Sequence, residues 1–395
     1  MKVKLMCVIE GKAKLLVPDL TFYRRTNGIA EPSYAPIFYN SKMSFSRDVS
    51  ILVLKTFKKF LNLNLNVCDA LAGTGVRGIR YALESSPSRL WLNDANPLAV
   101  NLINKNLSLN NLSSISTVSC LDARMMFLKN SYGTLRFNVI DIDPFGSPIK
   151  YVETAVRALK DGGLLSLTAT DIPALFGKYP ITCLRRYGAK PLKSSFAHEI
   201  AIRILLGSVV RRVASLDFAC KPVLSYFHNH FLRLHLILNK DISKANDSVK
   251  KLGWLLYCKN CSYREIRAGI DVSPPRKCPN CSGRLSLAGP LWCGNLFDKV
   301  FIRDMLSFMS TVELVNPGDV RSLLEIVYNE LDGPPTFYVI DELSRNLSVS
   351  SPSPSKVVSS LKSIGFFASR THFHPKGIRT NASIKIIYDV IRSSI

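Results

Sequence analysis

Acidic residues are scarce in this sequence of 395 residues. It has 29 Asp and Glu against 52 Lys and Arg, which gives a formal net charge of +23. Such a surplus disfavours cationic partners and attracts polyanions, nucleic acid first and an anionic membrane surface second. The basic residues occur along the whole chain, which favours a broad folded face that follows a phosphate backbone. A generally basic protein without such a partner is the alternative that charge alone leaves open.

Long apolar runs and a disulfide pattern are also missing. No stretch reaches the roughly 20 apolar residues of a membrane helix, and the first ten residues hold too short an apolar run for a signal peptide. Four of the ten cysteines form two close pairs, and five others are scattered singly (Cys7, Cys68, Cys120, Cys183, Cys220). We therefore expect no membrane association and a reducing, cytoplasmic location, with one metal site.

Length and composition predict a globular protein of two or three domains. Hydrophobic residues make up 47%, and a chain of this length can bury more than one core. The polar stretch Asp241–Lys251 is the predicted boundary between a domain at 1–240 and a second domain at 241–395. Residues 298–395 are expected to form an α/β module, and the sequence shows no internal repeat.

A glycine-rich turn follows a short predicted strand that contains Asp69. Gly73, Gly75 and Gly78 form a Gly-x-Gly-x-x-Gly pattern before a predicted helix at 76–84. Glycines are needed where a strand turns sharply into a helix and its backbone lies against a ligand. The next predicted strand ends in Asp94, an acid that can bind the two hydroxyls of a ribose. These features fit both a dinucleotide enzyme and an S-adenosylmethionine enzyme.

Two further predicted strands end in acids, and they favour the second alternative. One strand, at 115–123, carries Asp122 near its end. The Asp122 carboxylate can accept a hydrogen bond there from the exocyclic amine of an adenine. The other ends at Ile142 and is followed by Asp143-Pro144-Phe145-Gly146. Asp143 can accept a hydrogen bond or a proton and Phe145 can stack on a base, although Asp-Pro is also common in plain surface turns. In parallel sheets ligands bind beyond such strand ends, so the series predicts an adenosine-bearing cofactor beside a planar acceptor.

The order of these features resembles class I methyltransferases and predicts a Rossmann-like α/β fold. In that arrangement Asp69 and the glycine turn face the methionine end of the cofactor and Asp94 faces the ribose. Asp122 faces the adenine, and the turn from Asp143 to Gly146 faces the acceptor.

The paired cysteines predict a metal site. Cys258 and Cys261 form one Cys-x-x-Cys pair and Cys278 and Cys281 form another, 16 residues further on. This spacing matches a tetrahedral four-thiolate zinc site, which is structural because no coordination position stays open. Two disulfides or redox pairs are the alternative, and Cys293 is not expected to be a ligand.

Three other stretches carry polar signals. Ser46 is a candidate cap for a helix at 49–60, with Arg47 in its first turn. Arg47 lies there against the helix dipole, so it is expected to meet a ligand carboxylate or to pair with Asp48 or another acid. Residues 183–191 mix basic and aromatic side chains that suit phosphates and bases, and 352–395 is interpreted as a winged-helix-like or similar RNA-contacting piece.

Along most of its length the chain resembles the tRNA (guanine-26, N2)-dimethyltransferases of archaea and eukaryotes. It departs from them at Ser41, where the family usually has Pro, and at Ser46, where it usually has Asn. The motifs that carry the resemblance are Phe38-Tyr39-Asn40, Arg47-Asp48, Asp69, Gly73 to Gly78, Asn93 to Asn96, Asp141 to Gly146, Thr170-Asp171, Arg186 to Ala189, His198-Glu199, the four paired cysteines and Gly289 to Trp292.

The resemblance implies an enzyme that transfers one or two methyl groups from S-adenosylmethionine to N2 of guanine 26 in tRNA, with no obligatory protein partner. It implies a catalytic Asp143, with Phe38 and Phe145 near the target base. The C-terminal domain is then the tRNA-binding part. The implied contacts to S-adenosylmethionine are Arg47, Arg77, Asp94, Asp122 and Ala123.

The chemistry of the target supports these roles. The exocyclic amine of guanine is a poor nucleophile, so it must be held in line with the methyl donor. Asp143 can bind the amine and relieve the charge that develops on it. A stacked base must also be extruded, and the two phenylalanines can replace its lost stacking.

Three rival functions stay open at this point. They are a methyltransferase for another base amine of RNA or DNA, a nicotinamide-dependent oxidoreductase, and a non-catalytic zinc-ribbon RNA-binding protein.

Overall fold

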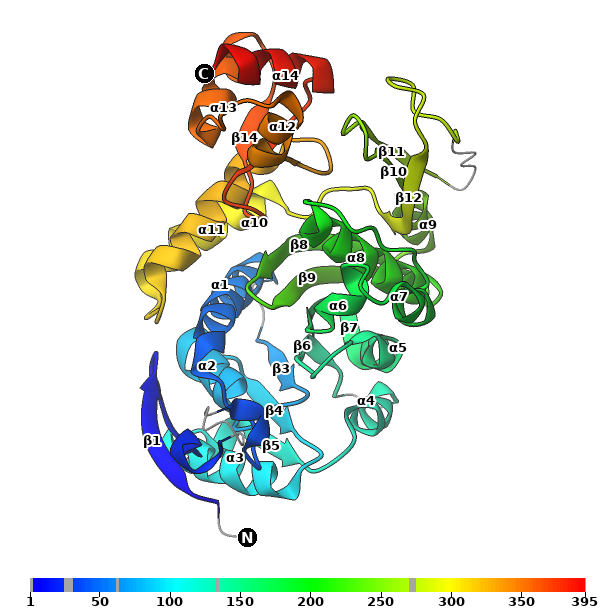
Figure 1. The fold of residues 1–395 in the computed structure, drawn as a ribbon. Coiled ribbons are helices and arrows are strands. Elements are labelled where there is room, and N and C mark those ends of the chain that lie inside the picture. Colours follow the sequence, from blue (N-terminus) through cyan, green and yellow to red (C-terminus); the bar gives the residue numbers. More distant parts are fainter. Residues whose placement is uncertain (1–2, 25–30, 62–63, 133–134, 270–274, 395) are drawn as a thin grey trace. The chain divides into compact units, whose positions relative to one another are not determined.

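The computed structural model describes residues 3–24, 31–61, 64–132, 135–269 and 275–394. The chain divides into two compact units (Figure 1). The first unit comprises residues 1–144, 151–167 and 303–322, and the second comprises 145–150, 168–302 and 323–395. Compact packing assigns no function to either unit, so the domain boundary expected near residue 240 stays a prediction.

The first unit begins with a β-hairpin and a long helix and continues with alternating strands and helices (Figure 1). Its regular elements are β1 (Leu5–Glu10), β2 (Ala13–Pro18), α1 (Ser44–Leu61), β3 (Asn66–Asp69), α2 (Val76–Ser85), β4 (Arg89–Asn93), α3 (Pro97–Leu109), β5 (Ser116–Ser119), α4 (Ala123–Ser131), β6 (Phe137–Ile142), α5 (Ile149–Ala158) and most of β7 (Leu159–Ala169).

The strands β3 to β7 form a parallel sheet in the order β5-β4-β3-β6-β7. The chain first moves from β3 outward to β5 and then crosses back to β6, so the direction reverses between β3 and β6. Asp69 of β3 lies opposite Asp141 of β6 in the register. In open α/β sheets this reversal is where ligands bind, beyond the carboxyl ends of the two strands.

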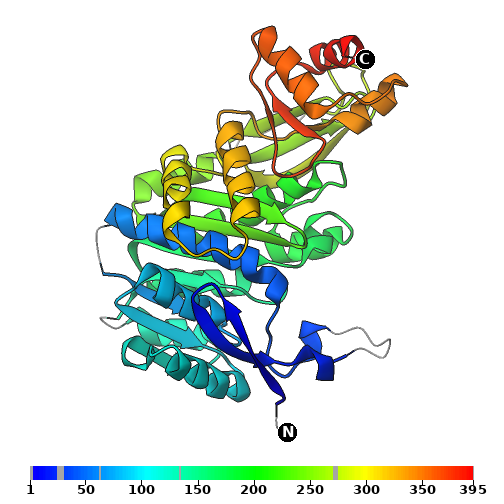
Figure 2. The same ribbon diagram turned by 90° about the vertical axis from the view of Figure 1, so that its left-hand side faces the viewer.

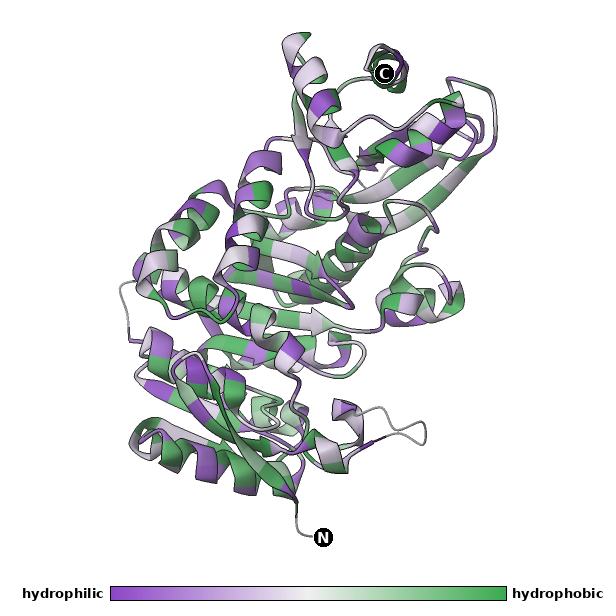
Figure 3. Ribbon diagram, turned by 60° about the vertical axis from the view of Figure 1, so that its left-hand side comes forward, coloured by the Kyte–Doolittle hydropathy of each residue, from purple (hydrophilic) through white to green (hydrophobic). Residues whose placement is uncertain are grey.

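Hydrophobic pattern explains why these segments form the centre of the unit. All six residues of β6 are buried, as expected for a strand covered by helices on both faces. The helices alternate hydrophobic and hydrophilic residues along their length (Figure 3). α3 has Pro97 in its first turn, and Asn96 caps it by accepting from the backbone amide of Leu98 at 3.0 Å, which fits the known preferences for both positions.

The hairpin β1–β2 packs on α2 and α3 and lies in front of them in Figure 2. The Asn106 side chain bonds both backbone groups of Leu16, donating to its oxygen at 3.0 Å and accepting from its nitrogen at 2.7 Å. The hairpin therefore fixes Glu10, the last residue of β1, against the helices of the sheet.

Two predicted element boundaries were wrong. α1 begins at Ser44, directly after a 3-10 turn (Ser41–Met43), so Ser46 lies inside the helix and is not its cap. β5 ends at Ser119, short of the expected strand at 115–123. Asp122 instead caps α4 by accepting from the backbone amide of Arg124 at 2.8 Å, because Asp prefers a helix cap to a strand.

The second unit holds three small antiparallel strand groups and the remaining helices. The groups are the pair β8–β9 and the sheets β11-β10-β12 and β13-β15-β14. The elements are α6 (Ile172–Leu175), α7 (Pro180–Tyr187), α8 (Ala197–Ala214), β8 (Phe218–His228), β9 (Phe231–Lys240), α9 (Ile242–Lys250), β10 (Leu252–Cys258), β11 (Arg264–Ala268), β12 (Leu285–Trp292), β13 (Tyr338–Val339), α12 (Ile340–Leu347), α13 (Pro354–Ser363), β14 (Ala368–Arg370), β15 (Gly377–Thr380) and α14 (Ile384–Ser393). α10 (Lys299–Phe308) and α11 (Pro317–Glu330) each contribute residues to both units.

Elements β13 to α14 form a module with its own core. A short strand and two helices precede the hairpin β14–β15, and β15 is the central strand of the sheet. A helix pair followed by a β-hairpin is the arrangement of a winged helix. The order of elements in this module agrees with a winged-helix-like fold, and contact of residues 352–395 with RNA stays a prediction.

Buried charges join three distant parts of the second unit. Arg379 of β15 contacts Glu199 of α8 at 2.9 Å and Glu330 of α11 at 3.1 Å. Arg203 contacts Glu199 at 2.8 Å. Burial raises the pKa of Glu199, but Arg379 and Arg203 outweigh it and bring it to about 2. These carboxylates therefore stay ionised and paired, as buried charges must.

No helix within the described ranges is long and apolar enough to cross a membrane. All ten cysteines lie in those ranges, and each is a free thiol.

Candidate active site at the strand reversal

The glycine turn after β3 has the backbone geometry that its sequence predicts. Gly73 and Gly75 have φ of +56° and +80°, which glycine adopts without strain. A Cβ on Gly73 would lie 2.9 Å from the carbonyl oxygen of Phe38, and one on Gly78 would lie 2.8 Å from the Leu92 side chain. The turn therefore keeps the Phe38 backbone close and lets α2 pack tightly on β4.

Asp94 holds this turn in place. One of its carboxylate oxygens accepts from the Gly73 amide at 2.8 Å and the other accepts from the Asn96 amide at 2.9 Å. The structure thus brings together the end of β4 and the glycine turn. The contact of Asp94 with a ribose stays a prediction.

Asp69 is fully buried beneath the turn and accepts from the Gly78 amide at 3.0 Å. Burial and the neighbouring Asp141 raise its pKa to about 7, although Arg77 acts in the opposite direction. The Asp69 carboxyl is therefore protonated in part near neutral pH, which is unusual for an aspartate.

Arg77 of α2 lies at the carboxyl end of β6, where it contacts two acids. Its guanidinium contacts the Asp143 carboxylate and donates to Ser50 Oγ at 3.0 Å. Its Nε lies 3.8 Å from Asp141, whose other oxygen accepts from the Tyr81 hydroxyl at 2.6 Å. Burial lowers the pKa of Arg77, but Asp141 and Asp143 outweigh it, so that the pKa rises and the side chain stays charged.

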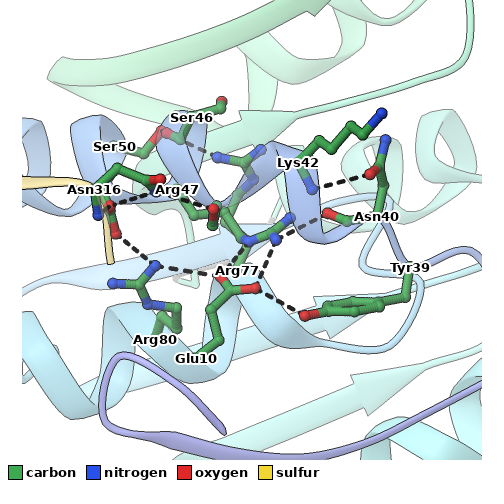
Figure 4. Close-up of polar contacts among 12 residues, drawn as sticks. Glu10, Tyr39, Asn40, Lys42, Ser46, Arg47, Ser50, Arg77, Arg80 and Asn316 are labelled. Carbon is green, nitrogen blue, oxygen red and sulfur yellow. Dashed lines mark hydrogen bonds and ion pairs between the residues drawn. The ribbon is translucent and has the colours of Figure 1, made fainter. Parts of the chain in front are cut away.

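Arg47 pairs with Glu10 and not with its neighbour Asp48 (Figure 4). Two of its guanidinium nitrogens meet the two Glu10 oxygens at 2.5 and 2.7 Å, and one also donates to the Asn40 carbonyl at 3.0 Å. The Tyr39 hydroxyl donates to Glu10 at 3.1 Å. The expectation of a partner acid for Arg47 is confirmed, and that acid comes from the N-terminal hairpin.

Asp48 has a different role. It lies 2.7 Å from Arg80 and accepts a hydrogen bond from the Asn316 backbone amide at 2.7 Å. Arg80 also contacts Glu10 at 3.2 Å. Burial raises the pKa of Glu10, but Arg47 and Arg80 outweigh it, and the pKa falls below its ordinary value. Arg80 also pairs with the buried Glu84 at 2.8 Å, so two arginines and three acids form one buried network that fixes Arg47.

Phe145 lies in a turn that is held at one end of β7. The Gly146 amide donates to Thr170 Oγ1 at 2.7 Å, and the Thr170 amide donates to the Gly146 carbonyl at 2.9 Å. The Phe145 side chain is exposed on this turn, and Phe38 is exposed in the segment after the 3-10 turn Pro32–Tyr34. Their roles at a target base stay predictions.

Asp122 and Ala123 stand at the start of α4. The Asp122 carboxylate pairs with Arg124 at 3.0 Å and is exposed, whereas Ala123 is buried. The Arg124 partner lowers the pKa of Asp122. Neither residue contacts the Arg77 cluster in the described interactions, and their contact with an adenine stays a prediction.

The four paired cysteines of the second unit meet at one point. Their sulfur atoms all lie within 4.8 Å of one another, and the pairs Cys258–Cys281 and Cys261–Cys278 are each 3.5 Å apart. A tetrahedral zinc with Zn–S bonds of ~2.3 Å needs sulfurs about 3.8 Å apart. The donor set therefore fits a four-thiolate zinc site, and Cys293 lies outside it.

Several residues of the site were not predicted as such. Glu10 contacts Arg47, Ser50 contacts Arg77 and Tyr81 contacts Asp141, yet each is far in sequence from its partner. Glu10 is separated from Arg47 by 37 residues and Tyr81 from Asp141 by 60. The only local signal is that each is a polar residue within a buried stretch, which does not name its partner.

Most of the chain is similar to one known family of proteins. The model of the family described as N2,N2-dimethylguanosine tRNA methyltransferase matches residues 11–392. The chain belongs to this family. Its strand order, glycine turn and Asp143–Arg77 pair are thus features of a member of the N2,N2-dimethylguanosine tRNA methyltransferases.

Relatives and a solved structure of this family cover almost the whole chain. A tRNA (guanine(26)-N(2))-dimethyltransferase of Methanosphaera stadtmanae is 37% identical, with coverage of 97% of this chain and 95% of that protein. An Aquifex aeolicus relative described as a tRNA (guanine(26)-N(2)/guanine(27)-N(2))-dimethyltransferase is 33% identical, with 96% and 93% covered. Trm1 from Pyrococcus horikoshii, solved with S-adenosyl-L-methionine, has a TM-score of 0.85 at 32% identity, with 98% and 100% covered.

Proposed function

We propose that this protein transfers methyl groups from S-adenosylmethionine to N2 of guanine 26 in tRNA. The observation that carries the proposal is the Asp143–Arg77 pair at the strand reversal of a chain that belongs to this methyltransferase family throughout its length. The target nucleotide is inferred from the relatives, which are described as methyltransferases of guanine 26. The cofactor is inferred from the Pyrococcus horikoshii structure, which was solved with S-adenosyl-L-methionine. The cysteine pattern supports a cytoplasmic location.

The cofactor is proposed to lie along the ends of β3, β4 and β5. Gly73 and Gly75 allow the sharp turn between β3 and α2, against which the cofactor would lie. Asp94 is proposed to bind its ribose, and Asp122 with Ala123 its adenine. When bound, S-adenosylmethionine supplies an electrophilic methyl group on its sulfonium sulfur. Arg47, fixed by Glu10, is proposed to meet the carboxylate of the methionine part, since guanidinium and carboxylate form a strong pair.

Asp143 is proposed to orient the guanine amine and to take up its proton. Arg77 holds one carboxylate oxygen, Oδ2, which leaves Oδ1 to accept from N2. The amine carries two hydrogens. Nitrogen would develop positive charge as it bonds to the methyl carbon, while the bond from that carbon to sulfur breaks and sulfur keeps its electron pair. A carboxylate held at that place stabilises this charge and accepts the proton that N2 loses. Phe38 and Phe145 are proposed to stack on the extruded base.

We also infer that the four cysteines bind one zinc ion. Cys258, Cys261, Cys278 and Cys281 fill a tetrahedral shell, so no position is left for a substrate. The ion would therefore be structural. It would fix the two loops at one end of the sheet β11-β10-β12, where the end of β10 meets the starts of β11 and β12. Among the described residues the buried cluster there contains Leu256 and Leu285 besides two of the cysteines.

Methyl transfer to an unmodified tRNA transcript tests the proposal. The purified protein is incubated with S-adenosylmethionine and the transcript, and the nucleosides are identified by mass spectrometry. We expect N2-methylated guanosine that disappears when guanine 26 is replaced by adenine. Methylated adenosine or cytidine, or no methylated nucleoside, would contradict the proposal.

The variant Asp143→Asn tests the role of the carboxylate. Asn keeps the shape and can still accept a hydrogen bond, but it cannot take up a proton. We expect a fall in the rate constant for transfer of about 100-fold or more, with little change in cofactor binding. A rate equal to that of the unmodified protein would remove Asp143 from the proposed chemistry.

A further inference from the structure

Helix α7 of the second unit is attached to the same turn that carries Phe145. Asp171 follows Thr170, which is hydrogen-bonded to Gly146. Asp171 in turn contacts the Tyr187 hydroxyl and accepts from Arg186 at 3.0 Å. Both partners belong to the last turn of α7. The helix is therefore fixed relative to the Phe145 turn through one half-buried carboxylate.

The opposite face of α7 presents apolar side chains to solvent. Ile181 is 74% exposed and Leu184 is 54% exposed, and Tyr179 just before the helix is 52% exposed. Ile181 and Leu184 are three residues apart and so share one face, while Cys183 and Tyr187 point into the core. Large apolar side chains grouped in this way commonly mark a contact surface.

The stretch of sequence that forms this face carries charge of one sign. Between Asp171 and Glu199 the sequence contains no acidic residue. It contains five basic residues, all of them exposed: Lys178, Arg185, Arg186, Lys190 and Lys193. A polyanion is favoured at such a surface, and a cationic or neutral protein partner gains nothing from it.

We propose that α7 and the loop before it, residues 177–187, form an RNA-contact surface beside the target nucleotide. This inference rests on the proposed function. The basic side chains bind phosphates of the tRNA, and Tyr179, Ile181 and Leu184 pack on the bases that lose a stacking neighbour when the target guanine leaves the helix. Apolar side chains pack against unstacked bases in proteins that unstack or kink nucleic acids. Aromatic side chains stack on any base, whatever the sequence of the nucleic acid.

The two kinds of side chain have separable effects, and variants of each test the surface. Ile181→Ala combined with Leu184→Ala removes the apolar contact. We expect single-turnover transfer at saturating tRNA to fall about tenfold or more, with a smaller change in tRNA affinity. With 2-aminopurine in place of guanine 26, the rise in fluorescence on binding, which reports unstacking, should also diminish.

Lys178→Ala combined with Arg185→Ala removes two phosphate contacts. We expect tRNA affinity to fall and the slope of log affinity against log salt to decrease by about one for each phosphate contact that is lost. The transfer rate at saturating tRNA should change little. Binding of S-adenosylmethionine, measured without RNA, should match the unmodified protein in both double variants.

Ile242→Ala is the matched control, because Ile242 is 64% exposed near the start of another helix of the same unit, α9. It should behave as the unmodified protein does. A photoreactive phenylalanine analogue at position 181 should crosslink to the tRNA, and the same analogue at 242 should not.

Failure of this inference is distinguishable from failure of the proposed function. If the unmodified protein makes no N2-methylated guanosine, the proposed function fails and this surface loses its basis. If the protein is active but both double variants behave as Ile242→Ala does, and position 181 gives no crosslink, the surface is overturned and the proposed function stands.

Discussion

Arg77 is the residue on which the geometry of the site depends most. It is the cation that contacts both Asp141 and Asp143. Arg77→Met would leave these buried or half-buried carboxylates uncompensated. We expect the rate constant for transfer to fall by about 10²–10³ and the free energy of unfolding to fall by about 3–5 kcal/mol.

Cofactor affinity distinguishes two roles for Arg77. The family resemblance implies a contact with S-adenosylmethionine, whereas the structure places its guanidinium on Asp143. Isothermal titration of cofactor and single-turnover transfer would be measured on Arg77→Lys, which keeps the charge but lacks the forked donors. A loss mainly in rate supports the positioning of Asp143. A loss confined to cofactor affinity would contradict that role.

Asp69 should make stability depend on pH. Its pKa is raised from the ordinary 3.8 to about 7 by burial and by Asp141, so the folded chain holds a proton that the unfolded chain releases above pH ~4. This contribution to stability is fully present at low pH. It is lost by up to about 1.4 kcal/mol per pH unit as the pH rises to 7, and it then levels off.

Asp69→Asn should remove that dependence, since its amide carries no titratable proton. Urea unfolding at pH 5, 6, 7 and 8 without cofactor measures it. Relative to the variant, the original protein should lose stability between pH 5 and 7 and only about 0.3 kcal/mol more by pH 8. Parallel curves for the two proteins at all four pH values would show that Asp69 does not titrate in this window.

Sequence predicted which residues gather at the strand ends but not how they pair. Asp69, Asp94 and Asp143 each end a buried run or directly follow one, which is a local pattern. The partner of Asp143 is 66 residues away in sequence, and nothing local identifies it. The same holds for Glu10, which the hairpin brings to Arg47. Polar pairing depends on how helices and hairpins pack, and one sequence does not encode that in any short window.

Among the elements, the sheet β11-β10-β12, which carries the loops with the four paired cysteines, is the one that a metal should stabilise. We expect about one zinc per chain by mass spectrometry of the purified protein. Cys278→Ser should lower the zinc content and the melting temperature, because few apolar side chains support these loops.

Cys293→Ser is the matched control for that experiment. Cys293 is half-buried near the same sheet, and its thiol bonds the Leu291 carbonyl, but it is outside the sulfur cluster. It should keep the zinc. Zinc content that is unaffected by Cys278→Ser, or iron in place of zinc, would contradict a zinc site formed by these four thiolates.

Helices and strands were predictable where the hydrophobic pattern and the glycine positions indicate the same element, as for α2 and β6. Their ends were less predictable where a polar residue can lie either within an element or at a helix cap. Asp122 was assigned to a strand, yet capping of α4 satisfies its carboxylate better. Ser46 was assigned to a cap, but a 3-10 turn capped by Asn40 leads directly into α1. Local propensity alone does not decide such cases, because the preceding turn sets the first residue of the helix.

For the whole molecule, net charge makes a prediction that no single contact makes. A protein of +23 that follows the tRNA backbone should release many counterions on binding. If six to ten phosphates are contacted, affinity should fall by about 10³–10⁵ between 50 and 200 mM salt. Filter binding of tRNA over this range measures the slope of log affinity against log salt.

Cofactor binding provides the internal control for that slope. S-adenosylmethionine is a small ligand and releases few counterions, so its affinity should change little over the same salt range. A steep slope for tRNA beside a flat one for cofactor would show that the charge surplus serves RNA binding. A tRNA slope equivalent to only one or two phosphates would show that most of the basic residues do not contact tRNA, and it would limit the interface to a local surface such as residues 177–187.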